Sequence, residues 1–149
     1  MLSTVEKVLI LKAVDLFSEI PGRDLARIAQ VTEELVVGRA ESLMKEGELG
    51  DSLFILVEGE VEVRKGRQAI AQLGPGECVG EMALLDSEPR SATVRAAEDV
   101  RVLRLDRDAF DELMDGHVDI ARGVIRVLTR RLRLTTAEAA VPLRRIVEP

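Results

Sequence analysis

The central part of the chain is divided into short apolar stretches by glycines. Between residues 35 and 105 the breaks are Gly38, Gly47, Gly50-Asp51, Gly59, Gly66 and Gly74-Pro75-Gly76. Strands this short, punctuated this regularly, are typical of an antiparallel barrel or jelly roll. Residues 61–64 and 100–105 also alternate between apolar and polar positions, as strands with one buried face do. The sequence therefore predicts an α+β fold that is mainly β, with an antiparallel β-barrel or jelly roll over residues 35–105.

Helical patterns flank this β region on both sides. Residues 1–34 form a helical lead-in, which begins with a capping-box spacing at Ser3 and Glu6 and is broken at Pro21-Gly22. Residues 106–136 carry two further helical patterns that are separated near Gly116. Because a proline disrupts a helix interior, we expect Pro142 to end the last helix and residues 137–149 to form a weakly ordered tail.

The composition excludes several classes of function. At 149 residues the chain is expected to be one domain, and its net charge of −6 disfavours duplex DNA. With three Phe, no Trp and no Tyr, it offers few stacking platforms for single-stranded nucleic acid. Cys78 is the lone cysteine, and no apolar run is long enough for a membrane span. We therefore expect a cytoplasmic chain that by itself binds neither nucleic acid nor membrane, although the natural chain can be longer.

Catalytic and metal chemistry find no support in the residues. One histidine and one cysteine are too few for the usual zinc sites. The phosphate-binding and dinucleotide-binding glycine motifs are missing from the sequence, and no carboxylate pairs with a recognisable nucleophile. His117, which follows Gly116, suits a capping or surface role. We predict a binding module without catalytic residues, metal site or cofactor.

The most informative stretch runs from Gly80 to Thr93. A short helix that opens on Gly80 directs unpaired N–H groups outward and favours an anion at its tip. Arg90 can present a planar fork to phosphate oxygens, and Ser91 adds a hydroxyl. Glu81 would repel a phosphate, but it can accept hydrogen bonds from the hydroxyls of a ribose. A phosphate site beside a sugar-hydroxyl site indicates a nucleotide.

This stretch resembles the phosphate-binding cassette of the cyclic nucleotide-binding domain family. The family pattern is roughly Phe-Gly-Glu-x-Ala-Leu-Leu, a short gap, and then Pro-Arg-(Ser/Ala/Thr)-Ala-Thr. The matching residues are Gly80, Glu81, Ala83, Leu84, Leu85, Pro89, Arg90, Ser91, Ala92 and Thr93. Val79 departs from the pattern, since it stands where the family usually has Phe. The glycine series before the cassette is similar to that of the family as well.

The resemblance implies an eight-stranded barrel that holds a cassette at residues 79–93, with a C-terminal hinge and lid over residues 106–136. It also implies a cyclic nucleotide as ligand, with cAMP expected and cGMP as the alternative. Arg90 and Ser91, with the small Ala92 behind them, would hold the cyclic phosphate, and Glu81 would accept from the ribose 2′-hydroxyl. The backbone N–H groups from Gly80 through Met82 to Ala83 would complete the cradle, and Leu73 and Val79 would line the base pocket.

The mechanism that the resemblance implies is a population shift. The ligand would contract the cassette, residues 106–114 would swing inward, and residues 118–134 would lie over the base as a lid. That segment has no aromatic residue, so we expect Arg131 to cover the base.

Partners and alternatives stay open at this point. The chain is expected to be part of a larger protein, with a fused effector domain or a homodimer formed through the terminal helices. One alternative is a ligand-free interaction or dimerisation domain of the same fold. Another is the sensor half of a transcription regulator, although too few residues follow Leu134 for a helix-turn-helix.

Overall fold

The computed structural model describes residues 1–147, with side chains as far as residue 137. Eight strands form two four-stranded sheets, ordered β1-β8-β3-β6 and β2-β7-β4-β5. The strands are β1 (Glu33–Val37), β2 (Ser42–Met44), β3 (Ser52–Glu58), β4 (Val61–Lys65), β5 (Gln68–Leu73), β6 (Cys78–Val79), β7 (Thr93–Ala96) and β8 (Val100–Asp106). The paired strands are antiparallel. The predicted mainly β fold of jelly-roll type is confirmed.

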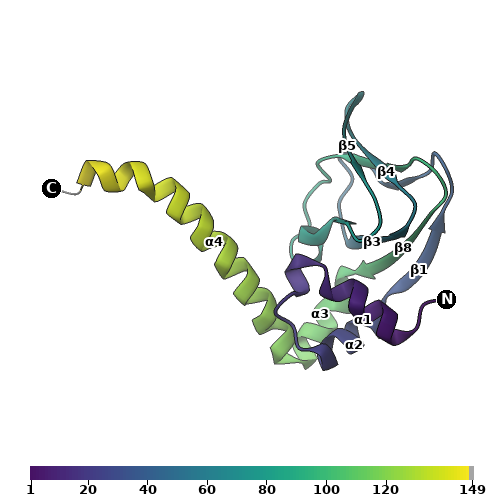
Figure 1. The fold of residues 1–149 in the computed structure, drawn as a ribbon, viewed down its shortest axis with the longest axis horizontal. Coiled ribbons are helices and arrows are strands. Elements are labelled where there is room, and N and C mark those ends of the chain that lie inside the picture. The colour runs from purple at the N-terminus through teal and green to yellow at the C-terminus, as the bar shows by residue number, and fades with distance from the viewer. Residues whose placement is uncertain (148–149) are drawn as a thin grey trace.

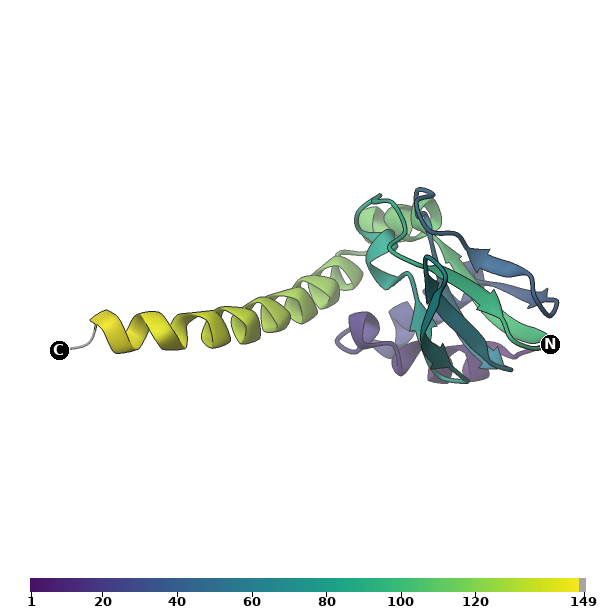
Figure 2. The same cartoon turned by 90° about the horizontal axis from the view of Figure 1, so that it is seen from above.

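Helices lie before and after the strands, and one short helical turn interrupts them. They are α1 (Thr4–Lys12), η1 (Asp15–Phe17), α2 (Gly22–Val31), η2 (Glu81–Leu84), α3 (Arg107–Gly116) and α4 (Val118–Val147). Both ribbon views show α1, α2 and α3 gathered beside the β1-β8-β3-β6 sheet, while α4 runs away from the rest of the molecule (Figures 1 and 2). None of the helices in residues 1–147 combines the length and the apolar character that a membrane span requires.

The β1-β8-β3-β6 sheet is covered on both faces, which explains the continuous apolar run in β3. Leu53 and Ile55 face a core shared with the helices, whereas Phe54 and Leu56 face a second core between the two sheets. In the helical core the rings of Phe17 and Phe110 lie 5.5 Å apart. These contacts fix α3 and the start of α4 against the N-terminal helices.

Element boundaries differ from the expected ones in several places. The lead-in bends after Lys12 into η1, and β1 begins at Glu33, before the expected start of the barrel. The sequence did not predict β6. This strand has only two residues, Cys78 and Val79, which are too few to show an alternating pattern.

The expected stop at Pro142 is not found, because α4 continues through it to Val147. A proline removes one hydrogen bond from a helix and can bend it without ending it. The predicted tail over residues 137–149 is therefore helical backbone as far as Val147, and residues 148–149 lie outside the described part of the chain.

Candidate functional site

A cavity of about 350 Å³ opens between the cassette and the β2-β7-β4-β5 sheet. The strand side of its wall is apolar, and the cassette side mixes the apolar Val79, Met82, Pro89 and Ala92 with the polar Glu88, Arg90 and Ser91. The lining residues are Met44, Val63, Leu73, Val79, Gly80, Met82, Glu88, Pro89, Arg90, Ser91, Ala92 and Val94. Seven of the ten residues predicted for the site are therefore brought together: Leu73, Val79, Gly80, Met82, Arg90, Ser91 and Ala92.

Arg90 is placed by the loop that precedes β3. Its backbone N–H donates to the carbonyl of Glu48 at 2.7 Å, and its carbonyl accepts from the N–H of Gly47 at 2.9 Å. The Arg90 guanidinium donates to the carbonyl of Ser52 at 2.9 Å. The loop thus pairs with the end of the cassette and aims a single arginine at the cavity.

Two glycines leave room for this side chain. A Cβ on Gly50 would lie 2.7 Å from the guanidinium carbon of Arg90, and one on Gly80 would lie 2.5 Å from its Nη1. Gly80 also has a φ of +82°, which L side chains rarely adopt. Both positions are therefore glycines because the arginine passes between them.

Arg90 lacks a close counter-ion among the described side chains. It takes part in none of the salt bridges found there, each of which joins another arginine to a carboxylate. Burial lowers the pKa of its guanidinium, and the charge of Asp51 opposes that shift. A partly buried cation at a cavity wall, with its charge not neutralised by a neighbour, is suited to an anionic ligand.

Three predicted residues do not line the cavity. Ala83 is buried at 8% exposure in the turn of η2. Glu81 turns to α4, where its Oε1 accepts from Nη2 of Arg131 at 2.5 Å. Arg131 also donates from Nη2 to Oδ2 of Asp15 at 2.6 Å. Because two carboxylates attract its guanidinium, Arg131 lies against η1 and η2 and away from the cavity wall where a base would lie.

The turn of η2 supplies fewer amides than expected. The N–H of Ala83 already donates to the carbonyl of Gly80 at 3.0 Å. In a 3₁₀ turn the bonding pattern leaves the first N–H groups, here those of Glu81 and Met82, without a partner inside the turn. The N–H of Ala83 is thus lost from the predicted cradle. The N–H groups of Glu81 and Met82 are the part of the cradle that the turn still supplies.

Sequence reasoning missed five lining residues. Met44, Val63 and Val94 form one apolar wall, since Val94 pairs with Val63 of β4 and with Met44 of β2. The alternation of residues along β4 was visible in the sequence, but the side of each strand that faces the cassette was not. Glu88 and Pro89 lie at the rim, where the loop before β3 holds the cassette.

A second cavity, of about 330 Å³, also borders Arg90. Its polar lining mixes both charges, with Lys45 and Arg104 opposite Glu48 and Asp51. Arg104 is already paired with Asp106 at 2.9 Å. The cavity beside the cassette is the better anion site, because Ser91 and the η2 turn face it as well.

Comparison with known proteins agrees with this geometry. The profile of the cyclic nucleotide-binding domain family matches residues 34–117, which is more than half of the chain. The N-terminal domain of a transcriptional regulator from Streptomyces coelicolor A3(2) superposes with a TM-score of 0.81 at 28% identity, over 86% of this chain and 95% of that one.

Two curated relatives are regulators. A CRP-like cAMP-activated global transcriptional regulator of Mycobacterium tuberculosis is 29% identical, over 88% of this chain and 61% of its own. A cAMP-dependent protein kinase regulatory subunit of Mycosarcoma maydis is 37% identical, over 68% of this chain and 21% of its own. The chain thus spans less than two thirds of the length of these relatives. By the profile match, and with the fold and the cassette as described, the chain belongs to the cyclic nucleotide-binding domain family.

Proposed function

We propose that the cavity beside the cassette binds cAMP and that the chain is the sensor module of a larger protein. The observation that carries the proposal is Arg90, a partly buried cation without a carboxylate partner among the described side chains, at the wall of a cavity that Ser91 also lines. A cyclic phosphate carries one negative charge, which this guanidinium can bind through two hydrogen bonds. The names of both relatives, one cAMP-activated and one cAMP-dependent, point to the same ligand.

The rest of the cavity suits a nucleoside. Its volume of about 350 Å³ lies within the range of about 300–1,000 Å³ that is usual for small-molecule sites. Leu73 and Val79 lie in its wall together with Val63 and Val94, so a base would meet aliphatic side chains and no aromatic ring. The residue proposed to bind the ribose is Glu81. Its carboxylate has to turn from Arg131 toward the cavity in order to accept a hydrogen bond from the 2′-hydroxyl.

The residue after Arg90 bears on the choice between cAMP and cGMP. Threonine directly after the arginine resembles the cGMP-preferring variant of the family, and alanine the cAMP-preferring one. Ser91 lies between them and is similar to bacterial cAMP-responsive regulators, so we infer cAMP over cGMP. Displacement of a fluorescent cAMP analogue by unlabelled cAMP and by cGMP compares the two affinities directly. Tighter binding of cGMP would reverse this choice while leaving the site in place.

Removal of the Arg90 charge tests the phosphate contact. Isothermal titration calorimetry should show that Arg90→Gln weakens cAMP binding at least about tenfold to a hundredfold, since a hydrogen bond to a charged group contributes about 1.5–3 kcal/mol. Arg95→Gln is the matched control, because Arg95 is an exposed arginine of β7 outside the cavity lining. Equal affinities in wild type and Arg90→Gln would refute the assignment.

The output of the module lies with α4 and whatever follows it. α4 leaves the domain with Ile125, Leu132 and Leu134 each about 60% exposed, at 59%, 66% and 62% (Figures 1 and 2). We infer that this helix contacts a fused effector domain or a second copy of the chain. The ligand-free scaffold of the same fold remains the alternative function, and the absence of any cyclic nucleotide binding would favour it.

Several expectations from the sequence stay predictions. They are a cytoplasmic location, the absence of catalytic activity, metal and cofactor, and the absence of nucleic-acid or membrane contact by this chain alone.

A further inference from the structure

One arginine links three segments that are distant in the sequence. The guanidinium of Arg131 donates to Glu81 at 2.5 Å and, from Nη2 and Nε, to Asp15 at 2.6 and 3.1 Å. Its Nη1 lies 3.6 Å from Sδ of Met82. Among the described side chains, every hydrogen bond and salt bridge between α4 and the cassette comes from Arg131. Asp15 belongs to η1, so the helical lead-in, the cassette and α4 meet at this single side chain.

The orientation of Glu81 conflicts with its proposed role at the ribose. Gly80 and Met82, the residues on either side of it, line the cavity, but Glu81 does not. Its carboxylate therefore has to turn from α4 toward the cavity before it can accept from a hydroxyl group there, and the bond from Arg131 to Oε1 opposes that turn. This step rests on the proposed function, because it takes the ligand to be a cyclic nucleotide.

We propose that Arg131 competes with the ribose 2′-hydroxyl of the ligand for Glu81. Arg131 is then a specificity-determining residue that lowers the affinity of the site and sets how strongly the site distinguishes a ribose from a deoxyribose. This role differs from the one expected from the sequence, in which Arg131 would cover the base and strengthen binding.

The electrostatics suit a competitor of moderate strength. Hydrogen bonds from Arg131 to Asp15 and to Glu81 raise the pKa of the guanidinium, since both carboxylates favour its charged form. Asp15 keeps the guanidinium beside Glu81, and the three side chains are partly exposed, at 57% for Asp15, 34% for Arg131 and 22% for Glu81. Ion pairs with this exposure are weak, and the loss of one changes an equilibrium by up to about fivefold.

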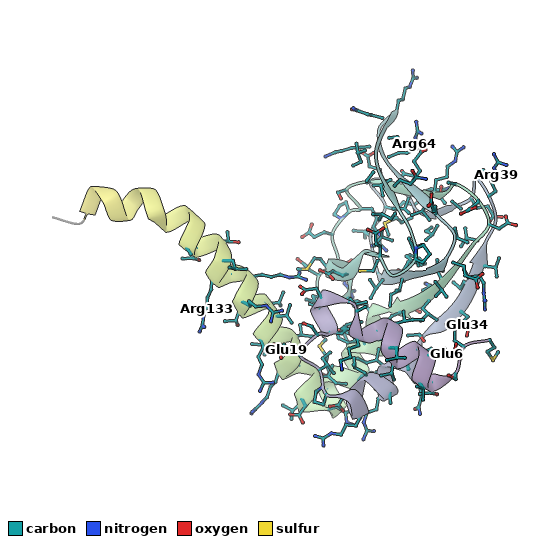
Figure 3. All side chains as sticks on the ribbon, viewed as in Figure 1. Glu6, Glu19, Glu34, Arg39, Arg64 and Arg133 are labelled. Atoms are coloured by element: carbon teal, nitrogen blue, oxygen red, sulfur yellow. The ribbon has the colours of Figure 1, made fainter. Side chains whose placement is uncertain are left out.

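The competition also couples the ligand to α4. The part of α4 before Arg131 is held by contacts that do not involve the cassette, because Gly123 packs closely against the backbone of Glu19 and Arg130 donates to Glu19 at 3.2 Å. Figure 3 labels Glu19 beside α4. Beyond Arg131 the described side chains of residues 132–137 are exposed. Loss of the bond to Glu81 therefore removes the charged contact between α4 and the cassette, and leaves the 3.6 Å approach of Arg131 to Met82 and its bonds to Asp15. By reciprocity, a partner that draws α4 away raises the affinity for the ligand.

A cycle of two ligands and two proteins tests the proposal by calorimetry. Arg131→Gln should bind cAMP about twofold to fivefold more tightly than wild type, because Glu81 is released. With 2′-deoxy-cAMP, which gives Glu81 no hydroxyl to accept from, the two proteins should bind equally. Arg133→Gln is the matched control: it removes an exposed arginine of α4 that takes part in none of the hydrogen bonds or salt bridges of the described side chains, leaves Arg131, Asp15 and Glu81 in place, and should bind cAMP as wild type does.

Three outcomes are distinguishable. Weaker or unchanged cAMP binding by Arg131→Gln overturns the competition, and weaker binding of both ligands restores the role at the base. An equal gain for cAMP and 2′-deoxy-cAMP also overturns it, since the effect would not depend on the 2′-hydroxyl. If neither wild type nor Arg131→Gln binds either nucleotide, the proposed function itself fails together with the competition.

Discussion

At the scale of single residues, the site is built around the path of one side chain. Arg90 reaches the cavity between Gly50 and Gly80, where added Cβ atoms would meet its guanidinium within 2.7 Å. The loop before β3 fixes its backbone through Glu48 and Gly47. The motif in the sequence identified Arg90, Ser91 and Gly80 because their spacing is local.

The motif could not predict the hydrogen bond between Glu81 and Arg131. Their bond joins residues 50 positions apart and depends on where α4 crosses η1. No local pattern contains that information, and the same holds for Met44 and Val63 in the opposite wall. The part of the site carried by the cassette was therefore predictable, and the parts supplied by the strands and α4 were not.

Substitution of Gly80 separates backbone strain from crowding. Gly76→Ala is the matched control, because Gly76 has a similar φ of +89° but nothing within 4 Å of an added Cβ. Each substitution should cost about 1–2 kcal/mol in free energy of unfolding for the left-handed backbone. Gly80→Ala should lose about 1–3 kcal/mol more, because its Cβ would lie 2.7 Å from the carbonyl of Ser52.

Urea denaturation measures both losses, and calorimetry with cAMP measures the binding. Gly80→Ala should also weaken binding of the nucleotide, because it displaces Arg90. Gly76→Ala should leave the affinity for cAMP unchanged. Equal losses of stability in the two variants would contradict the account of close packing around Arg90.

At the scale of elements, the anchored part of α4 has two faces with different roles. Ile120, Val124 and Val127 are buried in the helical core, whereas Ile125 on the same turns is exposed. The first face anchors α4 to the domain, and the second is turned away from the core.

A pair of isoleucines tests this division. Ile120→Ala should lower the free energy of unfolding by about 2–5 kcal/mol, because it removes fully buried methyl groups. Ile125→Ala, the same change on the same helix at 59% exposure, should alter it by less than about 0.5 kcal/mol. Chemical denaturation of the two variants checks the contrast, and similar losses would show that the outer face of α4 is covered in solution.

The elements themselves were predictable to different degrees. Glycine breaks and period-two alternation located most strands, and the capping box at Ser3 and Glu6 is present as predicted. β6 was not found from local pattern, because two residues carry no period and the strand exists only through its pairing with Phe54 and Ile55. Pro142 misled the prediction for α4, because one proline weakens a helix without always ending it.

At the scale of the whole molecule, the C-terminal segment is positively charged and the rest of the chain is negatively charged. Residues 117–149 contain seven arginines against three acidic residues, a sum of +4, so the rest of the chain carries −6 − 4 = −10. Part of this asymmetry is used internally, where Arg130 and Arg131 pair with acidic residues of the segment that holds η1. These pairs join the last helix to the first segment of the domain.

The central claim is that this domain binds a cyclic nucleotide in the cavity of Arg90, and thermal unfolding with added ligand tests it most directly. A ligand that binds the folded state adds about 2.7 kcal/mol of stability at one hundred times its Kd. The account predicts that cAMP raises the Tm in a concentration-dependent way, that cGMP does so less, and that linear AMP has little effect. A Tm that none of the three changes at millimolar concentration would contradict the account.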